Sequence, residues 1–271
     1  QFYNITYDMK QPYNVVGSVQ DEGSYMGSVK NTFGKKPEGF MAWDDAPGGE
    51  GTIIAIDPKD PDIMYASSFY GRLMKSDLRM PKTPWGQKPH PDSIRTKDIF
   101  PTKAADEEVH RGEWLAYTML SPHDNKIVYH GFQYLFESKD GGNTWKRISG
   151  DLTYNNKERM GRTPYAINHQ AITAIDESPL KKGLLYVGTD DGRIWVRMAE
   201  GKEFASIMKG IPQNAHASRL LASAHQPNRV YLSLSNRRED DDKPYVYVSD
   251  DNGTTWRSIA ANLPASPVNV I

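Results

Sequence analysis

Short apolar segments separated by polar turns recur along the chain, with no long apolar stripe of helical spacing. The repeated unit is an apolar strand, a polar turn that contains proline, and a second apolar strand that ends at an aromatic or β-branched residue. Copies of this unit cover 5–16, 53–65, 117–129, 172–186 and 220–231, so the second strands end 45 to 64 residues apart. A repeat of this length with several strands is typical of a propeller blade.

Two further strands complete each unit. A tight turn with glycine follows several of the second strands, at Asp21-Glu22-Gly23, Tyr70-Gly71 and Asp191-Gly192, and predicts a hairpin to a third strand. The fourth strand is marked by a motif of the form S-x-D-x-G-x-T-W. Its two full copies are Ser138, Asp140, Gly142, Thr144, Trp145 and Ser249, Asp251, Gly253, Thr255, Trp256.

The predicted fold is therefore an all-β propeller of four-stranded blades, with about five blades in the chain. The predicted blades cover 2–51, 52–113, 114–169, 170–216 and 217–267. Residues 268–271 repeat the apolar start of a first strand, so we expect another blade to follow, supplied by the remainder of the same chain or by a larger assembly. The alternative is a closed ring of five blades in which 268–271 are a frayed tail.

The S-x-D-x-G-x-T-W motif resembles the Asp-box of the bacterial neuraminidase repeat. That repeat occurs in sialidases, xyloglucanase-type glycosidases, sortilin-type propellers and large secreted bacterial proteins that are sortilin-like or glycosyl-hydrolase-like, and the last group is the most similar. The resemblance implies a β-propeller that is secreted or held in the bacterial cell envelope, at the periplasm or the cell surface. In such a motif serine, threonine and aspartate bond to the turn backbone and tryptophan packs between sheets, so we expect a structural role for Asp140 and Asp251.

Composition narrows the classes of function. The chain has 33 Lys and Arg against 34 Asp and Glu, a net charge of −1, which argues against nucleic acid as the main partner. It has no cysteine, so it has no disulfide framework and no thiolate site, and no apolar segment is long enough to cross a bilayer. The acidic runs at 239–242 and 250–253 lack the full alternating calcium loop, and we expect neither a metal nor a cofactor.

Strand order predicts two ends of the propeller. The proline turns and the Asp-box turns share one end, and the second-to-third-strand turns share the other end with the links between blades. We call this other end the connection end. The irregular segments 80–111, 149–170 and 236–244 are assigned to it, and variable loops on a rigid scaffold are where binding groups concentrate.

The candidate site residues are the charged, aromatic and histidine residues assigned to the connection end. The catalytic candidates are the carboxylates Asp21, Glu22, Asp44, Asp45 and Glu50. The ligand-binding candidates are Trp43, Glu107, His110, Arg111, Asn168, His169, Asp190, Asp191 and His216. The alternative for each of them is a solvated residue on a charged rim.

Two functions fit these residues. The first is a sortilin-like ligand-binding or scaffolding module for a protein, peptide or glycan, which needs no acid–base pair. The second is a glycoside hydrolase of the xyloglucanase or sialidase-like type that uses carboxylates at the connection end. Sialidases carry an Arg-Ile-Pro sequence near the first blade, whereas this chain has only Gly210-Ile211-Pro212 in a late blade. Neither Asp21 nor Asp44 matches the xyloglucanase catalytic motif, so hydrolase activity stays possible without an assigned catalytic residue.

Overall fold

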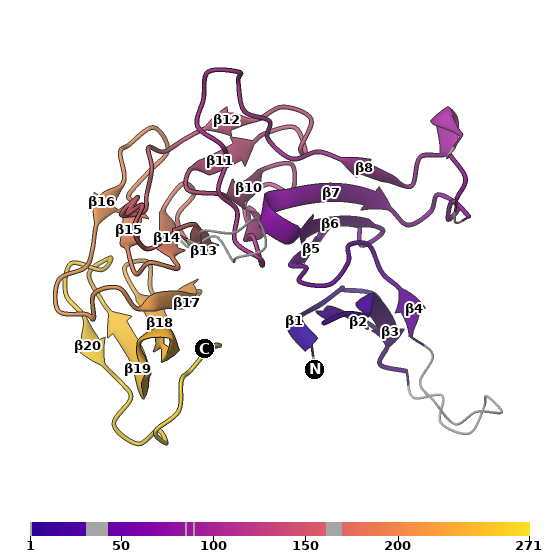
Figure 1. The fold of residues 1–271 in the computed structure, drawn as a ribbon. Helices are drawn as coiled ribbons and strands as arrows, with labels where there is room; N and C mark the ends of the chain where they lie inside the picture. The colour runs from indigo at the N-terminus through magenta and orange to yellow at the C-terminus, as the bar shows by residue number, and fades with distance from the viewer. Residues whose placement is uncertain (1, 31–42, 85, 89, 161–169) are drawn as a thin grey trace.

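The computed structural model describes residues 2–30, 43–84, 86–88, 90–160 and 170–271. These residues form five four-stranded antiparallel sheets arranged around a central channel, with the first strand of each sheet innermost (Figure 1). The described residues contain three short 3-10 segments and no α-helix. The predicted all-β propeller of five four-stranded blades is confirmed.

Each blade is a meander of consecutive strands. The strands of the first two blades are β1 (Phe2–Tyr7), β2 (Asn14–Val19), β3 (Gly23–Ser28), β4 (Asp44–Asp45), β5 (Ile54–Ile56), β6 (Ile63–Ser68), β7 (Arg72–Asp77) and β8 (Thr96–Asp98). The third and fourth blades contain β9 (Thr118–Leu120), β10 (Val128–Gly131), β11 (Leu135–Ser138), β12 (Lys146–Arg147), β13 (Ile172–Glu177), β14 (Leu185–Thr189), β15 (Ile194–Arg197) and β16 (Ala205–Ser206). The fifth contains β17 (His216–Ala222), β18 (Val230–Asn236), β19 (Asp241–Ser249) and β20 (Arg257–Ser258). The 3-10 segments are η1 (Phe69–Gly71), η2 (Pro91–Ser93) and η3 (Arg237–Glu239).

The core lies between neighbouring blades, because each sheet buries side chains on the faces it turns toward its neighbours. The fourth and fifth blades share a buried cluster that includes Tyr186, Leu220 and Leu232. The third and fourth blades pack through Tyr129 and Ile172. Smaller clusters join the first blade to the second and the second to the third. Burial of these side chains is the main favourable term that holds the blades in order.

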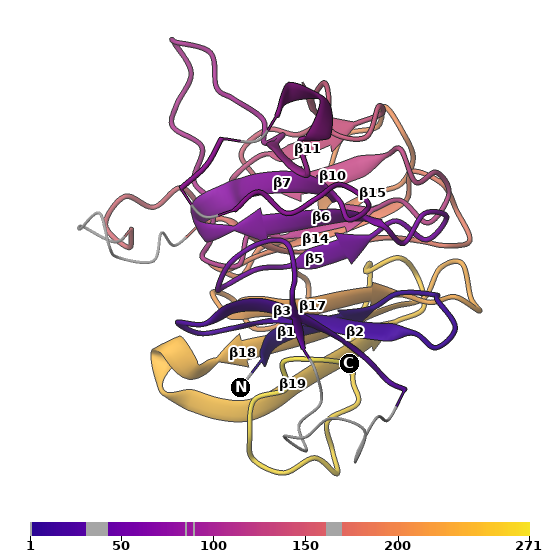
Figure 2. The ribbon, with the colours of Figure 1, turned by 90° about the vertical axis from the view of Figure 1, so that its right-hand side faces the viewer.

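The first blade turns one apolar face outward. Ile5, Tyr7 and Tyr13 are 58%, 63% and 45% exposed, whereas Val16 on the face toward the second blade is fully buried. Figures 1 and 2 show both chain termini on the side of the ring between the first and fifth blades. Residues 259–271 contain no strand, so the segment 268–271 does not itself form a further first strand here.

The two copies of the S-x-D-x-G-x-T-W motif form the same hydrogen-bonded turn, and we use Asp-box turn as a label for it. The Asp140 carboxylate accepts hydrogen bonds from Ser138 Oγ at 2.8 Å and from the Thr144 backbone N–H at 2.8 Å and hydroxyl at 2.7 Å. Asp251 accepts the equivalent bonds from Ser249 and Thr255 at 2.7 to 2.8 Å. The bonds from Thr144 and Ser138 to the ionised carboxylate lower the pKa of Asp140 to about 2. Every oxygen of both carboxylates is thus used within its own turn.

Each Asp-box turn is also attached to the preceding blade. Trp145 Nε1 donates to the carbonyl of Ile99, and Trp256 Nε1 donates to the carbonyl of Ile207 at 2.8 Å. In the other direction, a buried tyrosine near the start of a second strand reaches the turn of the next blade, as Tyr186 of β14 does with its Oη 3.1 Å from Asn252 Oδ1. The motif therefore joins neighbouring blades, which explains why the tyrosines and the Asp-boxes repeat together.

The links between blades and the turns between second and third strands lie at the predicted connection end, and one predicted segment does not. Residues 99–117, 148–160, 170–171 and 207–215 link blades there, together with the turns after β2, β6, β10, β14 and β18. The described residues of 80–95, which belong to the segment 80–111 that was predicted to lie at the same end, join β7 to β8 and so lie at the opposite end, with the Asp-box turns. The error arose because β8 carries no Asp-box, so its position inside 80–111 had no sequence signal.

Candidate functional site

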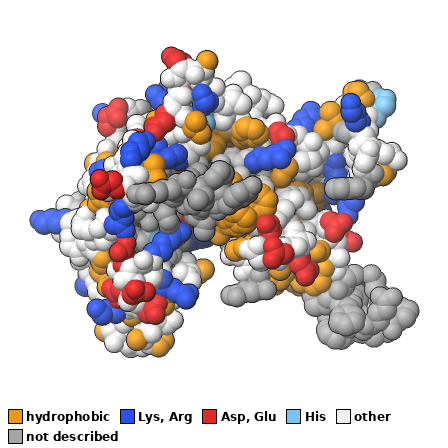
Figure 3. Space-filling model, in the orientation of Figure 1, with side chains coloured by type: hydrophobic (Ala, Val, Ile, Leu, Met, Phe, Trp, Pro, Cys, Tyr) orange, Lys and Arg blue, Asp and Glu red, His pale blue; other side chains and the backbone are white. Residues whose placement is uncertain are grey.

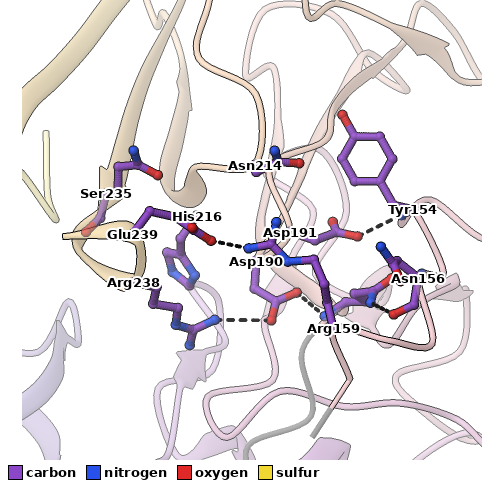
Figure 4. Close-up of a pocket in the computed structure, with 12 residues that line it drawn as sticks. Tyr154, Asn156, Arg159, Asp190, Asp191, Asn214, His216, Ser235, Arg238 and Glu239 are labelled. Carbon is purple, nitrogen blue, oxygen red and sulfur yellow. Dashed lines mark hydrogen bonds and ion pairs between the residues drawn. The ribbon is translucent and has the colours of Figure 1, made fainter. Parts of the chain in front are cut away.

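A cavity of about 580 Å³ opens at the connection end between the third, fourth and fifth blades (Figure 4). Its walls come from the described residues of the link between β12 and β13, the 207–215 link, the β14–β15 turn, the ends of β17 and β18, and η3. The lining residues are Tyr154, Asn156, Arg159, Gln170, Asp190, Asp191, Asn214, His216, Ser235, Asn236, Arg238 and Glu239. We call it the mouth cavity.

Asp190 is the most deeply buried charged group of the mouth cavity. Its Oδ1 accepts hydrogen bonds from the backbone N–H groups of Gln170 and, at 2.8 Å, Ala171. Its Oδ2 lies 3.3 Å from Arg238 Nη1, and none of the Asp190 side chain is exposed. Asp190 therefore fixes the link that enters β13 and, through Arg238, fixes η3 beside it.

Arg238 connects three blades at once. Besides Asp190 of the β14–β15 turn, it pairs through Nη2 with Glu113 Oε1 at 3.2 Å, across 125 residues of sequence. Glu113 is itself held, since its Oε2 accepts the Leu115 backbone N–H at 3.0 Å. Arg238 and His216 also line a second cavity of about 400 Å³ that lies among the innermost strands. We call it the channel cavity, and the two cavities share these side chains as a common wall.

Asp191 faces the mouth cavity from the same turn as Asp190. Its Oδ1 accepts the Thr189 hydroxyl at 2.5 Å and its Oδ2 accepts the Tyr154 backbone N–H at 2.7 Å. Burial raises the pKa of Asp191 above the ordinary aspartate value. Asp191 is therefore easier to protonate than an ordinary aspartate, which is the direction that a proton donor requires.

Tyr154 supplies an aromatic surface at the edge of the cavity. The ring is steadied by the guanidinium of Arg193 at 5.0 Å from its centroid and by the hydroxyl, which donates to Gln213 Oε1 at 3.0 Å. The residue nevertheless stays 42% exposed. A fixed and partly exposed tyrosine can offer both an apolar face and a polar tip to a ligand.

The charges of the mouth cavity are already paired with one another. Arg159 forms an ion pair with Glu239, and Arg238 forms one with Asp190. Asp191 is surrounded by neutral donors. Across the face shown in Figure 3, acidic and basic side chains are likewise interspersed rather than gathered by sign. The mouth cavity therefore offers many hydrogen-bonding groups but no unpaired cation among its described lining residues.

The sequence candidates are divided among several places. Asp190, Asp191 and His216 line the mouth cavity. Glu107, His110 and Arg111 lie together on the 99–117 link, outside the cavity lining, and Asn168 and His169 lie outside the described residues.

Arg111 and His110 are part of the packing over the third blade. Arg111 is 7% exposed, and its guanidinium bonds to Asp151 Oδ2 at 2.7 Å and to Glu108 Oε1 at 3.1 Å. His110 packs against Phe132 with ring centroids 4.8 Å apart, and burial lowers the pKa of its imidazole. These contacts tie the 99–117 link to β10 and β11, and they leave Arg111 little freedom to engage a ligand.

The catalytic candidates of the first blade are not brought to the mouth cavity. Glu50 Oε2 accepts hydrogen bonds from the Gln20 side chain at 2.9 Å and from the Asp21 backbone, which places Asp21, Glu22 and Glu50 at one exposed turn. Asp44 and Asp45 form the outermost strand β4, where Asp45 pairs with Lys82 at 3.4 Å. Trp43 stands just before this strand and packs beside the ring of Phe2. Strand order alone cannot distinguish residues on the outermost strand of a blade, such as Asp44 and Asp45, from residues near the centre of the ring.

Several residues of the site were not singled out from the sequence. Arg238, Glu113, Tyr154 and Arg159 are the most important of them. Arg238 and Tyr154 fall within irregular segments that pointed to the connection end. No local pattern marks which of their side chains meet, because their partners are distant in sequence.

The described residues contain no group of three or more His, Cys, Asp or Glu that could hold a metal ion. They also contain no helix that could span a bilayer.

Comparison with known proteins yields similarity of fold without similarity of sequence. No family model matches the chain, and no curated protein sequence matches it. Its structure is similar to a GH74 enzyme of Niastella koreensis, with TM-score 0.59, 15% identity and coverage of 97% of this chain and 37% of that one. An ancestral GH74 enzyme gives TM-score 0.60 and 13% identity, with 96% of this chain and 33% of that one covered.

The Swd1 (Cps50) β-propeller domain of Myceliophteria thermophila is also similar, with TM-score 0.55, 12% identity and coverage of 98% of this chain and 69% of that one. The chain thus spans about a third of the length of the two GH74 enzymes. At these identities the likeness extends to the fold, which is a β-propeller, and not to a family within it.

Proposed function

We propose that the protein is a glycan-binding propeller that holds a saccharide in the mouth cavity. The observation that carries the proposal is the pairing of charges there, since Arg159 and Arg238 are both occupied by carboxylates. A site of this kind offers hydrogen bonds to hydroxyl groups without attracting a strongly charged ligand. The exposed ring of Tyr154 supports the proposal, because the C–H face of a sugar can pack on it. An extracytoplasmic location, as the Asp-box resemblance implies, belongs to the same proposal.

Glycoside hydrolysis is the second candidate function. The likeness to GH74 enzymes favours it over a sortilin-like role. Within the site, Asp191 has a raised pKa, as a general acid requires, and Glu239 is a second carboxylate on the same cavity wall. Against it stand the hydrogen bonds that occupy both oxygens of Asp191 and the ion pair that occupies Glu239.

Calorimetric titration with neutral oligosaccharides tests the first function. We expect Tyr154→Ala and Asp191→Asn to weaken binding, whereas Asp45→Asn on the outer strand leaves it unchanged. Loss of binding in the Asp45 variant as well, or retention in the other two, would contradict the site assignment.

Reducing-end release from the same oligosaccharides tests the second function. Turnover that is lost in Asp191→Asn while binding persists would establish hydrolysis and give Asp191 its catalytic role. Binding without turnover would leave the protein a glycan-binding module.

A further inference from the structure

The channel cavity is built by irregularities in the innermost strands. The pairing of each first strand with its neighbour changes register at three places. These lie between Phe2 and Ile5 in β1, between Ile172 and Ala174 in β13, and between Ala217 and Arg219 in β17. The residues that fall within these shifts, Tyr3, Asn4, Thr173 and Ser218, all line the channel cavity. A β-bulge redirects side chains and is frequent beside binding sites. Three bulges around one cavity therefore indicate a shaped site rather than a gap between regular strands.

Arg219 directly follows the bulge of β17 and lines the same cavity. Among the residues that the structure describes, no carboxylate lies within 4.0 Å of its guanidinium, and its closest ring contact is Tyr117, with the guanidinium carbon 5.9 Å from the ring centroid. Arg238, which also lines the channel cavity, differs because it forms ion pairs with Glu113 and Asp190. Arginine stays charged at every relevant pH, so Arg219 leaves an excess positive charge in the channel cavity.

Asp176 is the carboxyl group whose charge acts on Arg219. Its Oδ2 is engaged by the backbone N–H of Ala222 at 2.6 Å, and burial raises its pKa to about 7. Asp176 forms no ion pair with Arg219, so the described residues provide no carboxylate in contact with this guanidinium.

Ser218 adds a second unsatisfied group. Its Oγ is buried and has no hydrogen-bond partner in the described part of the chain, although the residue lines the channel cavity. By contrast, the Thr173 hydroxyl on the neighbouring strand donates to the Ala217 carbonyl at 2.8 Å. A buried hydroxyl without a partner is costly, and an acceptor oxygen of a ligand would relieve this cost.

We propose that the channel cavity binds the carboxylate of an acidic sugar, with Arg219 as its ion-pair partner and Ser218 as an additional donor. This inference rests on the proposed glycan binding, because the neutral part of the same glycan would lie in the mouth cavity across the shared wall of His216 and Arg238. The volume of about 400 Å³ lies within the range of small-molecule sites, so a uronate unit fits the available space.

The test compares a neutral tetrasaccharide with the same tetrasaccharide carrying a single uronate unit at one end, by calorimetric titration of the 271-residue chain. We expect the acidic oligosaccharide to bind at least about tenfold more tightly at low salt, the scale of a charged hydrogen-bonded contact. The preference should shrink as salt is raised, because mobile ions screen the pair. Arg219→Gln should abolish the preference and leave binding of the neutral oligosaccharide unchanged, and Arg219→Lys should keep part of it.

Arg257→Gln is the matched control, since Arg257 lies exposed on the outermost strand of the same blade. Unchanged thermal unfolding midpoints show that the variants are folded. Equal affinity for the two oligosaccharides, or a preference that survives in Arg219→Gln, would overturn the inference while leaving glycan binding intact. Failure of both oligosaccharides would overturn the proposed function. If a tetra-glutamate peptide then bound in an Arg219-dependent way, the occupant would be an acidic peptide and the sugar assignment would be wrong.

Discussion

The Asp-box turns require glycine for two separate reasons, and substitution by alanine should reveal both. Gly142 and Gly253 have φ values of +93° and +87°, which cost an L-residue about 1 to 2 kcal/mol. A Cβ atom would also lie 2.4 Å from Ile99 Cδ1 at the first position and 2.4 Å from Ile207 Cδ1 at the second. Because a terminal methyl group can yield, the clash adds about 1 kcal/mol. We expect Gly142→Ala and Gly253→Ala each to lower the free energy of unfolding by about 2 to 3 kcal/mol.

Two other glycines separate these contributions. Gly201, in a degenerate copy of the motif, has a φ of +73° and open space around its Cβ position, so Gly201→Ala should cost only the strain of about 1 kcal/mol. Gly150 has neither a positive φ nor a neighbour within 4 Å, so its alanine variant should be neutral or slightly stabilising. Urea unfolding followed by both circular dichroism and tryptophan fluorescence gives the four values. Equal effects at Gly142 and Gly150 would refute the reasoning.

Three further predictions concern the core and the site. Burial raises the pKa of Asp176 from 3.8 to about 7, so folding opposes its ionisation, and the protein should lose stability as pH rises through this interval. The free energy of unfolding of Asp176→Asn, relative to that of the wild type, should therefore increase by about 2 to 4 kcal/mol between pH 4 and pH 8. If this difference stayed constant across the pH range, Asp176 would not be a buried carboxyl with a raised pKa. Arg238→Ala should lower the free energy of unfolding in urea by about 1 to 2 kcal/mol, because the buried carboxylates of Glu113 and Asp190 both lose an ion pair. The 40% exposure of the Arg238 side chain limits this loss. An unchanged unfolding midpoint would show that the three-blade contact is unimportant. Trp256→Ala should lower the free energy of unfolding by about 2 kcal/mol, which is less than for a fully buried tryptophan because Trp256 is only partly buried. Trp256→Phe should lower it by about 1 kcal/mol, because the hydrogen bond to the Ile207 carbonyl is lost while the packing is kept. Equal losses in the two variants would show that packing contributes nothing.

The fold could be predicted because its signals are local and repeated. The residues that mark the second strand in four of the repeats are buried in β2, β6, β10 and β14, as Val16, Tyr65, Tyr129 and Tyr186. Tyr186 shows why an aromatic residue recurs at this position, because its hydroxyl reaches the Asp-box turn of the next blade. Spacing between such positions reports blade length directly. Where the motif is missing, as in the second blade, strand β8 could not be located from the sequence, and the part of 80–111 that precedes β8 was assigned to the wrong end.

The candidate site could be predicted only in part. Asp190 and Asp191 could be predicted because a glycine turn marks them, and His216 because it directly precedes the fifth predicted blade, 217–267. The contact between Arg238 and Glu113 spans 125 residues and depends on how the first and last halves of the ring meet, which no periodic pattern encodes. Asp44 and Asp45 resembled loop residues in sequence, but they pair with β3 as an outer strand far from the channel.

The central claim is that the mouth cavity binds a glycan, and the most direct test is a crystal structure of the chain soaked with the tightest-binding oligosaccharide. The account predicts sugar density in contact with Tyr154 and Asp191 and bordered by Arg238, the residues that line this cavity. Sugar density at the outer strands of the blades instead, or an empty mouth cavity under conditions in which solution binding is saturated, would contradict it.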